Sequence, residues 1–198
     1  MAARIEFWVE YASTYSYLSV TRIGRLAAEQ AVEIDWQPFW LLPVRDQQGL
    51  AAPFPEGSAR ANYMWLDLER RARQLGLPYR RPEVYPFKSM PVARIGTVAA
   101  REGWCQAFTE AAFRLHWTQG VLMGTPENLA QALAAAGQDV ARVEALASSP
   151  EIKEALTRQT PRAIERGIFG APSFVVDGEL FWGDDRLEDA LQAARRAG

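Results

Sequence analysis

The order of hydrophobic patterns along the 198-residue chain is the feature that most limits its fold. Residues 4–10 alternate apolar and polar side chains as a strand does, and residues 15–30 then carry apolar side chains at helical spacing. Residues 32–39 return to a strand pattern. A strand, a helix and a second strand within forty residues predict a βαβ unit, whose crossover makes the two strands parallel and right-handed.

The middle of the chain has a different character. Residues 41–57 contain several prolines and glycines, which predict a loop, and the length of this loop suggests a functional or covering role. Beyond it, apolar spacing and capping residues predict a long helical region. The helices are expected at residues 58–76, 89–103, 106–119, 126–136, 139–148 and 151–166.

The strand pattern returns near the end of the chain. Two short β-type runs, 173–176 and 179–182, flank the dipeptide Asp177-Gly178, and Asp-Gly between apolar runs is a strong hairpin signal. A last helix is expected over residues 186–196. The chain therefore predicts βαβ, then a helical block, then ββα.

This order of elements is that of an α/β thioredoxin-like domain with an all-helical insertion. Residues 1–40 and 161–198 would form the thioredoxin-like domain, and residues 41–160 the insertion. A chain of this length has enough apolar side chain, 48% of its residues, for one sizeable core.

Charge and hydropathy argue against several classes of partner. The chain has 22 basic and 24 acidic residues and a formal net charge of -2, so nothing in its electrostatics favours nucleic acid or an anionic membrane. We find no apolar signal core and no stretch long enough to span a bilayer. We therefore expect a cytoplasmic protein that binds a small molecule or another protein.

Cys105 is the only cysteine and His116 the only histidine. This excludes an intrachain disulfide, a Cys-x-x-Cys redox pair and a thiolate zinc site, and it argues against a histidine metal site. We expect no metal, a buried Cys105 without a role, and a packed, hydrogen-bonded His116.

Ser13 is the first candidate functional residue, because it lies where the first strand passes into the first helix. Backbone N–H groups converge at a helix N-terminus and favour an anion, to which the Ser13 hydroxyl could donate. The same side chain could simply be the helix N-cap. The local sequence leaves both interpretations open.

Pro172, at the start of the third strand, is the second candidate. Proline at a strand start often marks a special turn, and a cis Ala171-Pro172 bond would leave the Ala171 backbone free to pair with an extended, peptide-like ligand. An ordinary trans proline at a strand edge is the alternative.

The third candidate is the strand-to-helix junction Trp182, Gly183, Asp184 and Asp185. Its N–H groups could hold a carboxylate and an aspartate could hold an ammonium, so the junction suits a zwitterion. Alternatively, Asp184 or Asp185 only caps the last helix. In a thioredoxin-like sheet, all three candidate segments would meet at one edge.

These segments carry a family resemblance that spans nearly the whole chain. The chain resembles the 2-hydroxychromene-2-carboxylate isomerase family, relatives of DsbA and of kappa-class glutathione transferases. The matching residues are Tyr11-Ala12-Ser13-Thr14-Tyr15-Ser16-Tyr17-Leu18, Arg60 with Tyr63 and Asp67-Leu68, Gly167-Ile168-Phe169-Gly170-Ala171-Pro172-Ser173-Phe174, and Phe181-Trp182-Gly183-Asp184-Asp185-Arg186-Leu187.

The resemblance implies a glutathione site in the thioredoxin-like groove. It implies that Ser13 stabilises the glutathione thiolate, in place of the cysteine of DsbA, and that the Ala171 backbone before a cis Pro172 pairs with the cysteinyl unit. The γ-glutamyl end would lie against Trp182, Gly183, Asp184 and Asp185. Thr14 departs from the pattern, since members usually have a proline there.

The resemblance also implies an activity. In this family the thiolate adds reversibly to a conjugated aromatic 2-oxo acid, the loosened double bond rotates, and glutathione is eliminated; only the anionic sulfur is a good nucleophile. Arg45 and Tyr85 correspond to substrate-binding positions, and a homodimer is expected. Residues 50–57 lack the asparagine that some members place there.

Two other functions remain open at this stage. A kappa-like glutathione transferase would share Ser13 and the groove but release the adduct instead of reverting it. A cysteine-less, DsbA-like peptide-binding protein would use the groove for extended peptides and would not need the acidic pair Asp184 and Asp185.

Overall fold

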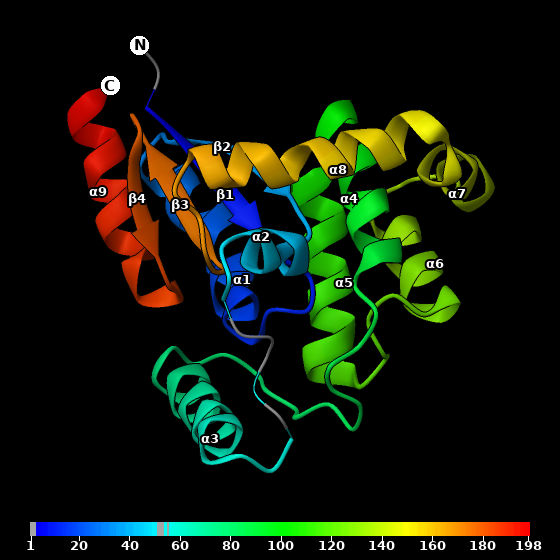
Figure 1. Cartoon of the computed structure of the whole chain (residues 1–198), viewed down its shortest axis with the longest axis horizontal. Helices are drawn as coiled ribbons and strands as arrows, with labels where there is room; N and C mark the ends of the chain where they lie inside the picture. The colour runs from blue at the N-terminus through cyan, green and yellow to red at the C-terminus, as the bar shows by residue number, and fades with distance from the viewer. Residues whose placement is uncertain (1–2, 51–53, 55) are drawn as a thin grey trace.

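A four-stranded sheet forms the centre of the computed structural model, which describes residues 3–50, 54 and 56–198 (Figure 1). Its strand order is β2-β1-β3-β4. The β1–β2 pair is parallel, and the β1–β3 and β3–β4 pairs are antiparallel. The bounds are β1 Arg4–Val9, β2 Glu33–Pro38, β3 Ser173–Val176 and β4 Glu179–Trp182. This topology confirms the predicted βαβ unit, the C-terminal hairpin and the thioredoxin-like fold.

Every helix that the sequence predicts is present, with boundaries that differ by one or two residues at most ends. Side chains that accept a backbone N–H from the first turn begin five of them, with Ser13, Ser58, Thr125, Asp139 and Ser149 as N-caps. The helices are α1 Thr14–Glu29, α3 Ala59–Gln74, α4 Met90–Glu102, α5 Cys105–Gln119, α6 Pro126–Ala135, α7 Val140–Ser148, α8 Pro150–Glu165 and α9 Leu187–Ala197, the last preceded by the 3₁₀ turn η1 Asp184–Arg186.

The predicted loop at 41–57 is wrong over its first part, where Leu41–Gln47 form helix α2. Pro43 lies in the first turn, where a backbone N–H has no helical partner to lose. Val44 on this helix is fully buried in the same apolar cluster as Ile168. This burial offsets the conformational entropy that so short a helix loses when it forms. Residues 51–53 and 55 of the predicted loop lie outside the described residues.

The two faces of β1 are buried under different layers. Ile5, Phe7 and Val9 point into the main core with residues of α1, α4, α5 and α9, and the Phe7 ring stacks on Phe174 at 5.1 Å. Trp8 points the other way, into a smaller cluster that α2 and α8 cover. Figure 1 shows α8 across one side of the sheet and α9 along its edge strand. Both faces of β1 are thus covered, so a site is expected in the loops that follow the strands.

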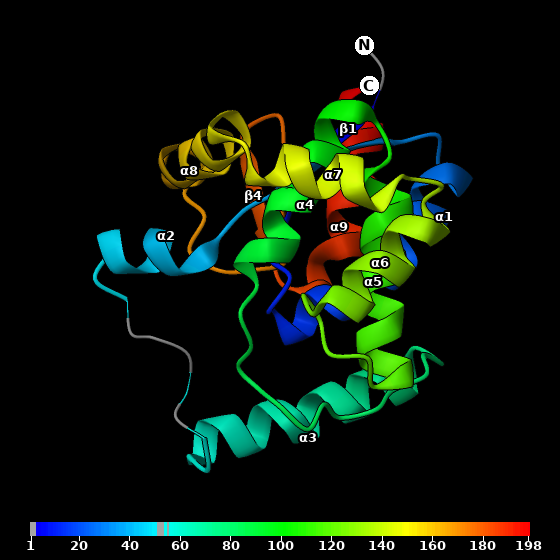
Figure 2. The same ribbon diagram turned by 90° about the vertical axis from the view of Figure 1, so that its right-hand side faces the viewer.

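Helix α3 lies at the edge of the molecule and packs against α1 (Figures 1 and 2). It buries Met64, Trp65 and Leu68 and exposes Tyr63 and Leu66 on its outer side. Within the part of the chain that the structure describes, no helix is long and apolar enough to cross a membrane.

Candidate functional site

The Ser13 hydroxyl links the start of α1 to the segment that precedes β3. Ser13 has an extended backbone (φ -76°, ψ 123°), and its Oγ accepts the backbone N–H of Ser16 at 3.2 Å, so it is the N-cap of α1. The same Oγ donates to the backbone oxygen of Ala171 at 2.8 Å, 158 residues away. The Ala171–Pro172 bond is cis. The structure therefore confirms the capping interpretation and also places the hydroxyl beside the start of β3.

The third candidate segment lies against the second. Trp182 pairs with Ser173 across the β3–β4 hairpin, and the Gly183 N–H donates to the Pro172 oxygen at 3.0 Å. The Trp182 side chain is 52% exposed, and its ring centroid lies 4.7 Å from that of Phe169. A Cβ on Gly170 would come within 2.3 Å of Trp182 Nε1, so this close approach requires glycine. All three predicted segments thus meet at one edge of the sheet.

The two acidic residues of the junction have different surroundings. Asp184 is only 4% exposed, and the Arg71 guanidinium donates to its Oδ2 through Nε at 3.1 Å and through Nη2. Burial raises the pKa of Asp184, and Arg71 opposes that rise. The Asp185 side chain is 51% exposed and pairs at 3.0 Å with the equally exposed Arg186. Asp185 is therefore the carboxylate that an incoming ammonium can reach.

Gly183 shapes this junction through its backbone. Its φ of +112° lies in the region that favours glycine, and a Cβ there would meet Asp185 Oδ1 at 2.5 Å. The turn from β4 into η1 therefore depends on glycine at position 183, and this turn sets where Asp184 and Asp185 point.

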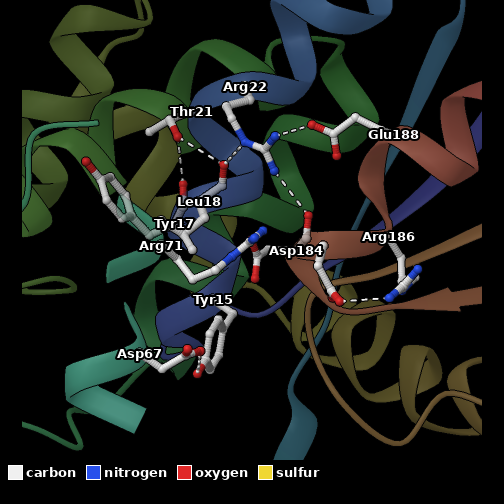
Figure 3. A network of polar contacts seen from close by, with 11 residues as sticks. Tyr15, Tyr17, Leu18, Thr21, Arg22, Asp67, Arg71, Asp184, Arg186 and Glu188 are labelled. Atoms are coloured by element: carbon white, nitrogen blue, oxygen red, sulfur yellow. Dashed lines mark hydrogen bonds and ion pairs between the residues drawn. The ribbon is translucent and has the colours of Figure 1, made fainter. Parts of the chain in front are cut away.

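A polar network ties α3 to the thioredoxin-like elements around this junction (Figure 3). Arg22 of α1 donates to the Asp184 backbone oxygen at 3.1 Å and forms an ion pair with Glu188 of α9. The Tyr15 hydroxyl donates to Asp67 of α3 at 2.7 Å. Burial, followed by the Asp67 carboxylate, raises the pKa of Tyr15 above its usual range. Helices α1, α3 and α9 are thereby fixed around one edge of the site.

The two predicted substrate-binding residues lie on different elements. Arg45, which we expected in a loop, is half-buried in the last turn of α2. Tyr85 is half-buried before Pro86, and its ring lies edge-on to that of Trp65 at 4.9 Å. Burial raises the pKa of Tyr85 to about 12, and the nearby charge of Glu10 adds to the rise. Tyr85 therefore lies near Glu10, which precedes Ser13 by three residues.

Glu10 is a residue that the sequence analysis missed. It is 5% exposed at the end of β1 and accepts a hydrogen bond from the Ser89 hydroxyl at 2.6 Å. Burial raises its pKa to about 7, against hydrogen bonds from Ser89 and from the backbone of Ala12 and Ser13. An acidic residue directly after buried strand positions, three residues before Ser13, was the signal available in the sequence.

Arg71 is the second residue that the sequence analysis missed. It lies four residues after Asp67 on α3, one helical turn along the same face, so both side chains point toward α1 and the β4–η1 junction. That spacing was visible in the sequence. Its partner Asp184 was not, because the pair joins residues 113 positions apart.

The remaining candidates behave as packed side chains. Cys105 is buried in α5, and burial raises the pKa of its thiol to about 12. His116 is 1% exposed and its Nδ1 accepts the backbone N–H of Met123 at 3.2 Å, while burial lowers its pKa to about 4. Among the described residues, no group of three or more histidine, cysteine or acidic side chains could hold a metal ion.

Comparison with known proteins identifies relatives along the same chain length. Residues 4–194 match the family model described as a DSBA-like thioredoxin domain. The chain is 28% identical over 187 residues to a 2-hydroxychromene-2-carboxylate isomerase of Pseudomonas putida, covering 92% of this chain and 90% of the relative. It is 26% identical over 200 residues to a kappa 2 glutathione S-transferase of Caenorhabditis elegans, covering 92% and 88%.

A solved structure shows the same similarity in three dimensions. The structure of a 2-hydroxychromene-2-carboxylate isomerase matches with a TM-score of 0.85 and 28% sequence identity. The match covers 98% of this chain and 95% of that chain. The shared fold therefore includes the helical insertion as well as the sheet.

Proposed function

Because this chain belongs to the DSBA-like thioredoxin domain family, we propose that it is a glutathione-dependent isomerase of aromatic 2-oxo acids of the 2-hydroxychromene-2-carboxylate type. The similarity to isomerases of that name along nearly the whole chain supports this proposal. Its natural compartment would be the cytoplasm, where reduced glutathione keeps thiols reduced.

One observation carries the proposal: Ser13 stands at the helix N-terminus, and no cysteine stands near it in the sequence. The single cysteine of the chain, Cys105, is buried in α5. Thiol chemistry at this site therefore depends on a thiol that a ligand brings. The N-terminal end of α1 favours negative charge, and the Ser13 hydroxyl, which donates to the Ala171 oxygen in this structure, would turn its proton to a bound thiolate.

The surrounding residues suit glutathione as that ligand. The Ala171 backbone lies within hydrogen-bond reach of Ser13 and offers a pairing surface for a peptide-like chain. Asp185 is exposed for the γ-glutamyl ammonium, while the Arg71–Asp184 pair holds the β4–η1 junction beneath it. Trp182 and Phe169 present an exposed apolar surface beside these groups. The donors and acceptors present fit a zwitterionic thiol peptide.

Bound glutathione would supply a thiolate that adds reversibly to the conjugated oxo acid and loosens its double bond. The Ser13 hydroxyl would donate a hydrogen bond to the sulfur while the sulfur is negative, before addition and after elimination. Arg45 would bind the substrate carboxylate, for which a guanidinium is well suited, and Tyr85 would contact the aromatic ring. The functional unit would be a homodimer.

A kappa-like glutathione transferase is the second candidate, and the relative of that name favours it. It would use Ser13 and the same groove. The two activities differ in whether glutathione is returned: an isomerase changes the ultraviolet spectrum of the oxo acid without consuming glutathione, and a transferase consumes one glutathione for each substrate.

The test combines ligand binding with turnover. Thermal melting with millimolar glutathione should raise the melting temperature, because a ligand that binds only the folded state stabilises it by mass action. Ser13→Ala should lower isomerase turnover by about 10²–10³-fold, the usual loss when one preorganised donor is removed. Ser16→Ala, one turn further along α1, is the matched control and should retain turnover.

Three outcomes count against the proposal. Unchanged turnover in Ser13→Ala removes Ser13 from the mechanism. Stoichiometric loss of glutathione assigns the transferase activity instead. A melting temperature that millimolar glutathione does not move excludes both activities and leaves a peptide-binding protein as the function of the groove.

A further inference from the structure

Glu10 is a buried carboxylate in the loop that leads from β1 to the candidate site at Ser13. It directly follows β1, three residues before Ser13, and it is 5% exposed. Its Oε1 accepts the Ser89 hydroxyl at 2.6 Å, so it links the β1–α1 loop to the start of α4. A hydrogen bond from the Ser13 backbone N–H lowers the pKa of Glu10, and Ser13 is also the residue whose hydroxyl would face the ligand.

Nothing in the described part of the chain neutralises this carboxylate. No arginine or lysine there forms an ion pair with Glu10. The titratable groups that face it are two phenols, Tyr11 in the loop and Tyr85 before α4, and both have a raised pKa and stay neutral. A buried carboxylate without a cation is costly, and it gains a proton easily.

We propose that Glu10 takes up the proton that is lost when glutathione binds at Ser13 as a thiolate. This inference rests on the proposed function. A negative sulfur at Ser13 and a negative carboxylate on Glu10 repel each other, and the burial of Glu10 weakens the solvent screening of that repulsion. The two groups therefore share one negative charge: before binding it lies on Glu10, and after binding it lies on the sulfur.

The exchange balances without any further reactant. The S–H bond breaks, its electron pair stays on sulfur, and an O–H bond forms on Glu10. The net result is the same whether the proton passes directly or through solvent, because the coupling depends only on the energies of the two charged states. Ser89 and the loop backbone would remain as hydrogen-bond partners of the protonated acid.

The number of protons released on binding tests this inference. Calorimetric titration of glutathione, repeated in buffers of different ionisation enthalpy, measures that number. At pH 7.5 a thiol with an unperturbed pKa of about 8.5 is mostly protonated, so binding as a thiolate alone releases about one proton. We expect the wild-type protein to release less than half of that and Glu10→Gln to release about one.

Two controls isolate Glu10. S-methylglutathione has no thiol proton and should release none from either protein. Glu110 lies on α5, where burial also raises its pKa and Gln106 donates to it at 3.0 Å, and Glu110→Gln should behave like the wild type. If Glu10→Gln does not fold, Ser89→Ala keeps the carboxylate and removes its hydroxyl donor, which shifts the pH dependence of proton release to higher pH.

The outcomes separate this inference from the proposed function. Absence of glutathione binding to the wild-type protein overturns both. Binding with equal proton release by the wild-type protein and Glu10→Gln, or an unshifted pH dependence in Ser89→Ala, overturns the role of Glu10 and leaves the glutathione site standing.

Discussion

Two buried carboxylates lie in the loops around the candidate site, and they differ in whether a cation neutralises them. Asp184 lies at the β4–η1 junction, 4% exposed, with the Arg71 guanidinium on its Oδ2 and Arg22 on its backbone oxygen. Glu10 lies at the β1–α1 loop, 5% exposed, with a serine hydroxyl and backbone N–H groups as its partners. Equal burial thus accompanies very different charge compensation.

This difference in charge compensation indicates different roles for the two carboxylates. A buried ion pair that joins α3 to η1 fixes geometry, because removing either partner leaves a charge in a poorly solvated place. A buried acid with neutral partners fixes little charge and can change its protonation within the ordinary pH range. We therefore assign Asp184 to holding the junction and Glu10 to responding to what binds there.

The largest effect should come from removing the Glu10 charge. The folded-state pKa of about 7 lies above the unfolded value of 4.5, so the folded protein binds this proton more tightly and Glu10 costs stability as the pH rises from about 4.5 through 7. The shift corresponds to about 3 kcal/mol. Relative to wild type, Glu10→Gln should gain about that much free energy of unfolding between pH 4.5 and pH 8.

Urea unfolding at both pH values measures this gain. All other titrating groups are common to the two proteins, so their contributions cancel in the difference. A Glu10→Gln protein whose stability relative to wild type does not change with pH would show that Glu10 titrates as an ordinary exposed acid.

A smaller effect should follow from breaking the compensated pair. Arg71→Met leaves Asp184 buried without its cation, and we expect a loss of about 2 kcal/mol, below the full range for buried pairs because the Arg71 side chain is 27% exposed. Arg73→Met on the same helix breaks an exposed pair with Glu69 and should cost about 0.5 kcal/mol or less. Equal losses in both proteins would remove the special role of Asp184.

The smallest effect should come from the neighbouring contact between α1 and α3. Tyr15→Phe removes the hydroxyl that donates to Asp67 at 2.7 Å and leaves the ring in place. A hydrogen bond to a charged group contributes about 1.5 kcal/mol at the low end of its range, which suits a pair that is only partly buried. Chemical unfolding of Tyr15→Phe beside Tyr63→Phe, whose side chain is 61% exposed on the outer side of α3, measures the difference.

The sequence predicted most of the fold because the signals that determine it are local. Alternating apolar residues gave β1 and β2, Asp177-Gly178 gave the hairpin, and capping residues such as Thr125 gave helix starts. Helix α2 was missed because proline and glycine nearby indicated a loop, whereas Pro43 falls in a first turn that tolerates it and Val44 gains a buried site. The helical conformation of that segment therefore depends on burial against residues distant in the sequence.

The candidate site was predicted only in part, and the reason is also physical. Ser13, Ala171 and Trp182 are found where their motifs and the predicted topology place them. The difference between Asp184 and Asp185 depends on Arg71, which reaches Asp184 from an inserted helix, and no local pattern shows such a contact. The burial of Glu10 likewise depends on Ser89, 79 residues later.

The hydrogen bond between Ser13 and Ala171 has a consequence for how the protein is made. Its partners are 158 residues apart, so β1 has left the ribosome long before β3 exists to pair with it. During that interval one edge of β1, with its unpaired backbone N–H and C=O groups, lacks its eventual neighbour and is open to wrong partners. The helices made in between cover Ile5, Phe7 and Val9 in the finished protein, and they can shield these side chains until β3 is made.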